Sequence, residues 1–196
     1  MKSILLSAFE PFGGEEINPA KEAVLRLGGD GIYKIILPVE YARAGRLLTE
    51  EIERVRPDIV IMTGQAGGRD AVTPERRAVN SRNAKAPDSA GRLCAGEKIL
   101  EGGEEELPAT LDPEALKEAI LKQGIPARVS DSAGTFVCND VFYQALEYLK
   151  AAPVRADFIH LPWCLEQAAR HPGQFCLPVG TMVRALEAAV EAARRE

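Results

Sequence analysis

The sequence predicts an α/β fold, a three-layer α/β/α sandwich with a mostly parallel central sheet. Apolar strand patterns and amphipathic helix patterns alternate along nearly the whole chain, which is typical of helices that cover both faces of a parallel sheet. One strand pattern, Asp58–Thr63, is a continuous apolar run bounded by Pro57 and Gly64, as expected for a strand buried on both faces. The 196 residues contain no internal repeat and no linker, so we expect a single domain spanning residues 1–196.

The first half of the chain begins with a predicted strand at Ser3–Ala8 that runs into a glycine-containing loop. Asn18 can cap a short helix that has Pro19 in its first turn, and a pair of glycines ends this helix. Ile32–Leu37 is the second predicted strand. A longer amphipathic helix follows, and its inward stripe consists of Tyr41, Ala44, Leu48, Ile52 and Val55.

The second half contains a glycine-rich loop, a long segment without periodicity and three further helices. Residues 83–107 are rich in Gly, Pro and Glu, and we expect a long surface excursion there. Asp112 can cap a helix that has Pro113 in its first turn. The other predicted elements are strands near Arg76–Asn80, Ala127–Ser130 and Arg155–Leu161, and helices from about Cys138 to Leu149 and over Pro178–Arg194.

In open α/β sheets, the working site lies beyond the carboxyl ends of the strands. The segments that follow Leu6, Thr63, Ser130 and Ile159 are therefore expected to lie close together. Each of these segments carries an unusual run of glycine, aromatic or polar residues. We expect the functional side chains to come from them.

Cys138 is the first candidate for chemistry, because the helix pattern of the segment Asp131–Leu149 starts close to it. Thr135 or the glycine turn before it can serve as the helix cap. The positive end of a helix favours a thiolate over a thiol, and its free N–H groups can hold a negative oxygen. The same apolar stripe also suits an inert core cysteine, so the helix pattern alone leaves both interpretations open.

Composition excludes several classes of function. The net charge is −5 and the sequence pI is near 5.3, which disfavours nucleic acid as a partner. No apolar run is long enough to span a membrane, and the N-terminal run is too short for a signal peptide. The four cysteines show no zinc-ligand spacing. We therefore expect no metal, no membrane partner and a cytoplasmic protein with reduced thiols.

Four segments, in order and over nearly the whole chain, resemble pyroglutamyl-peptidase I, the pyrrolidone-carboxylate peptidases. They are FEPFGGEEINPA at 9–20, GQAGGRDAVTPERRAVN at 64–80, SAGTFVCNDVFY at 132–143 and FIHLPWCLEQ at 158–167. The resemblance implies a cysteine omega-peptidase that removes an N-terminal pyroglutamyl residue from peptides. It also implies a homotetramer and no cofactor.

The resemblance assigns Cys138 as the nucleophile, His160 as the histidine and Glu75 as the third member of a catalytic triad. A thiolate would attack the pyroglutamyl carbonyl and form a thioester, while an imidazole moves the proton. A carboxylate would fix the tautomer of the imidazole. Each residue also has a structural interpretation, since a strand histidine is often a core group and Glu75 in PERR suits a surface ion pair.

The substrate ring is a small neutral lactam, which calls for an apolar slot with a few hydrogen-bonding groups. By resemblance, Phe9 and Phe12 shape this slot, Phe136 and Val137 lie near the nucleophile, and Asn18 and Gln65 are polar candidates. These aromatic residues and Asn18 also suit purely structural roles. The segment NSRNAKAPD departs from the family, which usually has an arginine and a larger aliphatic residue at Lys85 and Ala86.

Two other functions fit parts of the sequence. One is a binding module of the same fold that recognises pyroglutamate without turnover, although the intact Cys138, His160 and Glu75 argue against it. The other is a different α/β enzyme, such as a nucleoside phosphorylase-like protein whose glycine loops cradle phosphate. The Gly64–Gly68 loop lacks the G-K-[ST] ending of a phosphate loop, and no G-x-G-x-x-G motif opens a helix.

Overall fold

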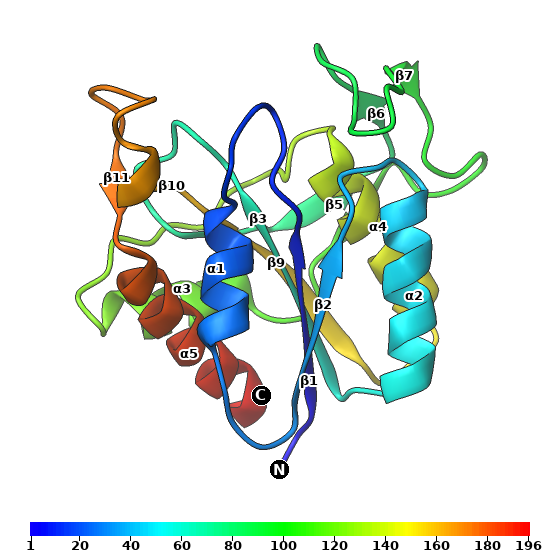
Figure 1. Ribbon diagram of the computed structural model, residues 1–196. Helices are drawn as coiled ribbons and strands as arrows, with labels where there is room; N and C mark the ends of the chain where they lie inside the picture. Colours follow the sequence, from blue (N-terminus) through cyan, green and yellow to red (C-terminus); the bar gives the residue numbers. More distant parts are fainter.

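A computed structural model describes all 196 residues and has three layers, with a sheet between two groups of helices (Figure 1). The sheet has five strands in the order β2-β1-β3-β9-β4. Four strands are parallel, and the short β4 runs antiparallel to β9. The predicted fold class is confirmed. The bounds are Ile4–Phe9 for β1, Ile32–Leu37 for β2, Ile59–Gln65 for β3, Thr73–Pro74 for β4 and Arg155–Leu161 for β9.

Helices cover both faces of the sheet and bury two separate cores. Helices α1, α3 and α5 lie on one face, while α2 and α4 lie on the other (Figure 1). Alternate side chains of each strand enter opposite cores, as with Leu6 and Leu5 in β1. No helix is long and apolar enough to cross a membrane. The helix bounds are Pro19–Arg26 for α1, Arg43–Val55 for α2, Pro113–Leu121 for α3, Val137–Leu149 for α4 and Val179–Arg195 for α5.

Two helix starts follow directly from local chemistry. Asn18 Oδ1 accepts a hydrogen bond from the Ala20 N–H at 3.0 Å, and Asp112 Oδ1 accepts one from the Glu114 N–H at 2.9 Å. A proline occupies the first turn of both helices, where its missing N–H leaves no bond unmade. The caps predicted from the sequence are confirmed, and they fix where α1 and α3 begin.

The predicted strand Ala127–Ser130 is wrong as a continuous element. Its two end residues form isolated parallel bridges to Val72 and Glu75. Backbone hydrogen bonds also join residues 127–130 to residues 72–75, from Arg128 N to Val72 O at 3.1 Å and from Ser130 N to Pro74 O at 2.9 Å. Pro74 has no N–H to donate between them, so the ladder breaks into two pieces.

The predicted excursion 83–107 is more ordered than its composition suggests. It contains β7 (Ala95–Glu97), which pairs with β6 (Arg82–Asn83), and it leads into β8 (Glu106–Pro108), which pairs with β5 (Arg77–Val79). Strands of two or three residues are too short to show periodicity, so sequence analysis could not find them. Beyond β9 lie β10 (Trp163–Cys164), the 3-10 helix η1 (Leu165–Gln167) and β11 (Cys176–Leu177).

Asp157 is a fully buried carboxyl group in β9. Its Oδ1 accepts a hydrogen bond from the Phe158 N–H at 2.6 Å, and its Oδ2 has no partner. Burial, with the nearby charge of Glu75, raises the pKa of Asp157 well above its usual value. A raised folded-state pKa stabilises the fold below the unfolded pKa, and this contribution is lost as the pH rises through the folded pKa.

We therefore expect Asp157→Asn to be more stable than the wild type at neutral pH, because the variant holds no charge there. The gain should be about 1.4 kcal/mol for each unit by which the pKa is raised, and it should shrink toward pH ~4. Urea unfolding of both proteins at neutral and acidic pH measures it. A difference that does not change with pH would contradict this account.

Candidate active site

The thiol of Cys138 lies in the first turn of α4, at the end of the sheet where β3 and β9 finish. Phe136 is the N-cap residue, so the helix starts where the sequence predicts. The Thr135 hydroxyl donates to the Asn83 carbonyl and does not cap the helix, which corrects that prediction. The first N–H with a helical partner is that of Asp140, which donates to Phe136 O at 3.1 Å. The N–H groups of Val137, Cys138 and Asn139 precede it and remain free of backbone acceptors.

The surroundings of the sulfur explain why a glycine occupies the last position but one of β3. A methyl group on Gly64 would lie 2.9 Å from Cys138 Sγ and 3.0 Å from the ring of Phe158. Both distances are too short for carbon, so only glycine lets the strand and the thiol approach this closely. The thiol therefore packs directly on the carboxyl end of β3.

His160 comes from the end of β9 and lies beside the same strand end, because it is the register partner of Gly64. It points to the same face as Phe158, two residues earlier, and this is the face that α4 covers. Its ring lies 4.6 Å from that of Phe158 between centroids, and the residue is only 3% exposed. The imidazole is thus held on the side of the sheet that carries Cys138.

Glu75 directly follows β4 and is fully buried. Its Oε1 lies 2.7 Å from His160 Nδ1 and 2.6 Å from Arg69 Nη1. Burial raises the pKa of Glu75, but the hydrogen bond and charge of His160 and the charge of Arg69 outweigh it, and the pKa is lowered. An ionised carboxylate only accepts hydrogen bonds, so Nδ1 of His160 carries the proton and Nε2 is the basic nitrogen.

Burial controls the protonation of the other two groups. Burial and then the charge of Glu75 raise the pKa of the Cys138 thiol to about 12, against the charge of Arg69. Burial lowers the pKa of His160, although the hydrogen bond and charge of Glu75 act to raise it. The free protein therefore holds a neutral thiol near a neutral imidazole. The predicted shift toward thiolate at the helix N-terminus is reversed by burial.

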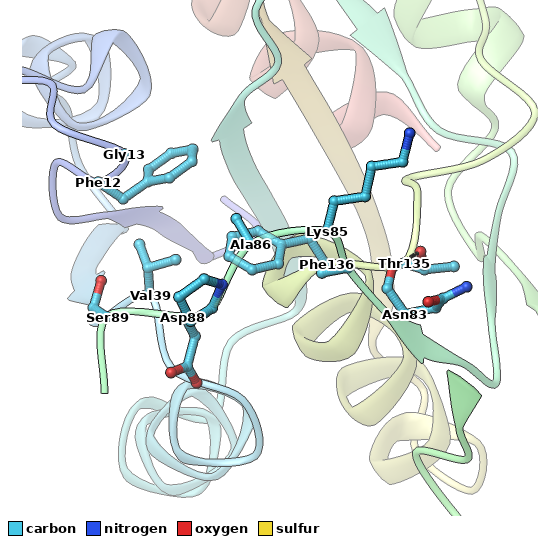
Figure 2. Close-up of a pocket in the computed structure, with 12 residues that line it drawn as sticks. Phe12, Gly13, Val39, Asn83, Lys85, Ala86, Asp88, Ser89, Thr135 and Phe136 are labelled. Carbon is cyan, nitrogen blue, oxygen red and sulfur yellow. Dashed lines mark hydrogen bonds between the residues drawn. The ribbon is translucent and has the colours of Figure 1, made fainter. Parts of the chain in front are cut away.

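A hollow of about 480 Å³ lies next to the turn before α4 and is lined by both aromatic and polar side chains (Figure 2). Phe12 enters it from the loop after β1, and Phe136 enters it from the turn before α4 (Figure 2). Their ring centroids are 6.2 Å apart. The hollow does not include Cys138, His160 or Glu75 itself, and Phe136 links it to the thiol two residues further on. Its size suits a small organic group.

Comparison with known proteins identifies the family of the chain. The family model described as pyroglutamyl peptidase matches residues 2–196. The chain belongs to the pyroglutamyl peptidase family. It is 46% identical to the pyrrolidone-carboxylate peptidase of Erwinia tasmaniensis and 45% identical to that of Chromobacterium violaceum, with 97% of this chain and 92% of each relative covered. These matches do not favour a phosphorylase-like enzyme or a binding module without catalysis.

Solved structures of the pyroglutamyl peptidase family agree over the full chain. Pyroglutamyl peptidase I from Bacillus amyloliquefaciens superposes with a TM-score of 0.96 at 39% identity, covering 100% of this chain and 96% of that one. The pyrrolidone carboxyl peptidase from Thermococcus litoralis has a TM-score of 0.93 at 33% identity, covering 100% and 94%. The fold and the family prediction are therefore confirmed together.

The structure brings only two of the six predicted pocket residues of this pyroglutamyl peptidase to the hollow, Phe12 and Phe136. Phe9 and Val137 are buried in the core. Asn18 is fully buried, with Oδ1 used as the α1 cap and Nδ2 donating to Glu10 O at 3.3 Å. Gln65 is buried and its Oε1 accepts from Gln167 Nε2 at 3.0 Å. These four residues do not line this hollow, and their predicted contact with the substrate stays a prediction.

Sequence analysis missed one feature of this site. Arg69 lies against Glu75, and its only sequence signal is its place in the glycine-rich motif. Lys85 and Ala86, which depart from the family pattern, lie in the wall of the hollow that residues 83–89 form. Asp88 shapes this wall by accepting hydrogen bonds from the N–H groups of Tyr41, Ala90 and Arg92.

Proposed function

We propose that the chain removes the N-terminal pyroglutamyl residue from peptides, with Cys138 as the nucleophile, His160 as the acid–base group and Glu75 as its orienting carboxylate. One observation carries the proposal. A buried, ionised Glu75 holds Nδ1 of His160 at 2.7 Å, on the face of the sheet where Cys138 opens a helix. This arrangement supports thiol-based acyl transfer, since it supplies a nucleophile, a base and a fixed tautomer.

In the first half of the reaction, Nε2 of His160 takes the thiol proton as Sγ of Cys138 attacks the pyroglutamyl carbonyl carbon. The free N–H groups at the start of α4 are suited to hold the oxyanion that forms. The carbon–nitrogen bond then breaks, the imidazolium gives its proton to the leaving amine, and a thioester remains. In the neutral resting pair the thiol still holds its proton, so His160 has to take that proton for Sγ to attack.

In the second half, His160 takes a proton from water, and the hydroxide attacks the thioester carbon. The carbon–sulfur bond breaks, the proton returns to Sγ, and pyroglutamate leaves. Glu75 stabilises the positive imidazolium in both halves, since its pKa is lowered and it stays ionised. The thiol and then water supply the electron pairs that attack carbon, the imidazole carries each proton, and the carboxylate only stabilises the charged imidazole.

The hollow between Phe12 and Phe136 is proposed to hold the substrate ring. Its two aromatic rings offer apolar surface to a flat neutral lactam. The polar groups of residues 83–89 on the same wall are available for the ring amide. A free α-amino group would bring a charge into this space, where the one lining carboxylate, Asp88, already accepts three backbone N–H groups, so the charge would be poorly paired, which is costly.

We therefore expect hydrolysis of a fluorogenic pyroglutamyl amide and at least about 100-fold lower kcat/KM for the matched glutaminyl amide, which is a discrimination typical of buried polar recognition. The pyroglutamyl residue is the glutaminyl residue closed to a lactam with loss of ammonia, so the comparison tests recognition of the lactam. Phe12→Ala should raise KM for the pyroglutamyl amide, while Tyr33→Ala on the exposed part of β2 serves as a matched aromatic control. Comparable turnover of both amides would exclude the ring pocket.

The proposal extends to the organisation of the protein. We propose that residues 1–196 act as one catalytic domain and that the protein works in the cytoplasm, which is supported by four free thiols. The net charge of −5 argues against nucleic acid as a partner. A homo-oligomer, a tetramer by family resemblance, is expected, and its mass in solution by light scattering tests this.

A further inference from the structure

Arg69 joins three segments around the proposed triad. From the loop after β3, its Nη1 donates to Glu75 Oε1 at 2.6 Å and also contacts the Thr73 hydroxyl. Its Nη2 donates to the Ser132 carbonyl at 3.4 Å, in the turn that leads into α4 and Cys138. One guanidinium therefore links the carboxylate that orients the imidazole to the turn that carries the nucleophile.

Few other positive charges lie near Glu75 besides that of Arg69. Glu75 is fully buried, its Oε1 is shared between Arg69 and His160, and its Oε2 has no hydrogen-bond partner. A buried carboxylate without a cation would take up a proton, because the charged form is poorly solvated there. His160 is neutral in the free protein, so Arg69 is the permanent positive charge that faces Glu75.

We infer that Arg69 is a positioning residue of the reaction, which keeps Glu75 ionised against His160 and ties it to the turn before Cys138. The inference rests on the proposed function and adds a fourth side chain to it. Arg69 itself touches neither the thiol nor the imidazole by a hydrogen bond, so it acts through Glu75 and through charge.

The direction of its electrostatic effect is the same on every group around it. The titratable groups that face Arg69 are Glu75 after β4, His160 in β9 and Cys138 in α4, and its charge lowers the pKa of all three. The neighbouring Asp70 is paired with Arg128, and Asp157 lies on the opposite face of β9. Loss of the charge should therefore raise the pKa of Glu75, so that the active form, in which Glu75 is ionised, is reached only at higher pH.

The test compares Arg69→Met, which removes the charge, with Arg69→Lys, which keeps the charge but loses the guanidinium fork. We expect the acidic limb of kcat/KM for Arg69→Met to move up by about one pH unit or more, with at least about tenfold lower activity at neutral pH. Arg69→Lys should lose activity but keep the pH profile near that of the wild type. Arg76→Met is the matched control, because Arg76 is adjacent to Glu75 in sequence but half-exposed and paired with Glu114 and Asp131.

A second readout does not need the substrate. The rate at which iodoacetamide alkylates Cys138, followed by mass spectrometry, should show the same alkaline shift in Arg69→Met and none in Arg76→Met. Failure of the wild type to cleave pyroglutamyl substrates would refute the proposed function, while the alkylation profile would still test Arg69. An unshifted profile in folded Arg69→Met overturns the inference.

Folding of the variant is itself informative. If Arg69→Met is unstable because it leaves a buried carboxylate unpaired, then Glu75→Gln in the same chain should restore much of the lost stability. Thermal unfolding of both single variants and the double variant measures this coupling. If the stability losses of the two single variants simply add in the double variant, Arg69 is not the counter-charge of Glu75. The same conclusion follows if Arg69→Met does not fold and the added Glu75→Gln does not restore folding.

Discussion

Replacing Cys138 with serine is expected to abolish hydrolysis of a pyroglutamyl amide, with a loss of about 10⁴-fold or more in kcat/KM. The hydroxyl of serine holds its proton far more tightly than a thiol, and the site already raises the pKa of the Cys138 thiol to about 12 through burial. The same burial would act on serine, so His160 would face a proton that it cannot remove at neutral pH. Steady-state kinetics on the purified variant, with circular dichroism to verify the fold, measures the loss.

The other cysteines provide the control for this substitution. Cys176 is partly exposed at the start of β11, and its Sγ donates a hydrogen bond to the Gln174 carbonyl at 3.6 Å. Cys176→Ser should keep activity within about twofold, as expected for a surface change away from the site. Cys94 and Cys164 are buried, so their serine variants are expected to lose stability but keep their turnover per folded molecule. Full activity of Cys138→Ser would show that Cys138 is not the nucleophile.

The parts of the fold that could be predicted from the sequence are those set by local chemistry. Asn18 before Pro19, and Asp112 before Pro113, specify helix starts because a side-chain oxygen and a missing N–H act within one turn. The strand Arg155–Leu161 was predicted with its observed bounds, since a long apolar strand carries its own pattern. Such signals need no knowledge of distant contacts.

The features that sequence analysis missed depend on distant contacts. Asn18 caps its own helix, as predicted, but its Nδ2 also donates to the Glu10 carbonyl, a partner that no sequence pattern marks. Thr135 was expected to cap α4, but its hydroxyl contacts the Asn83 carbonyl across 52 residues. The helix N-terminus was expected to favour a thiolate, but burial against Gly64 and Phe158 is not visible in the order of residues. Only the assembled fold decides which of two competing local effects prevails.

The last residue with a large expected effect is His160, for which the informative substitution is glutamine. A glutamine side chain can still donate a hydrogen bond to Glu75, but it cannot take the thiol proton. We expect kcat/KM near neutral pH to fall by about 10³-fold, within the range for loss of a general base. With a thiol pKa of about 12, only about one thiolate in 10⁵ would form unaided at pH ~7.

That small thiolate fraction gives His160→Gln a signature that a simple folding defect lacks. Its residual activity should rise about tenfold per pH unit between pH ~7 and pH ~10, because hydroxide then replaces the missing base, whereas the wild type should be nearly flat there. His171→Gln is the matched control, since the His171 ring stacks on Trp163 and bonds Glu15 at 2.9 Å, away from Cys138. A pH profile of His160→Gln that stays parallel to the wild type would mean that another group removes the thiol proton, and the assignment of His160 as the base would then fail.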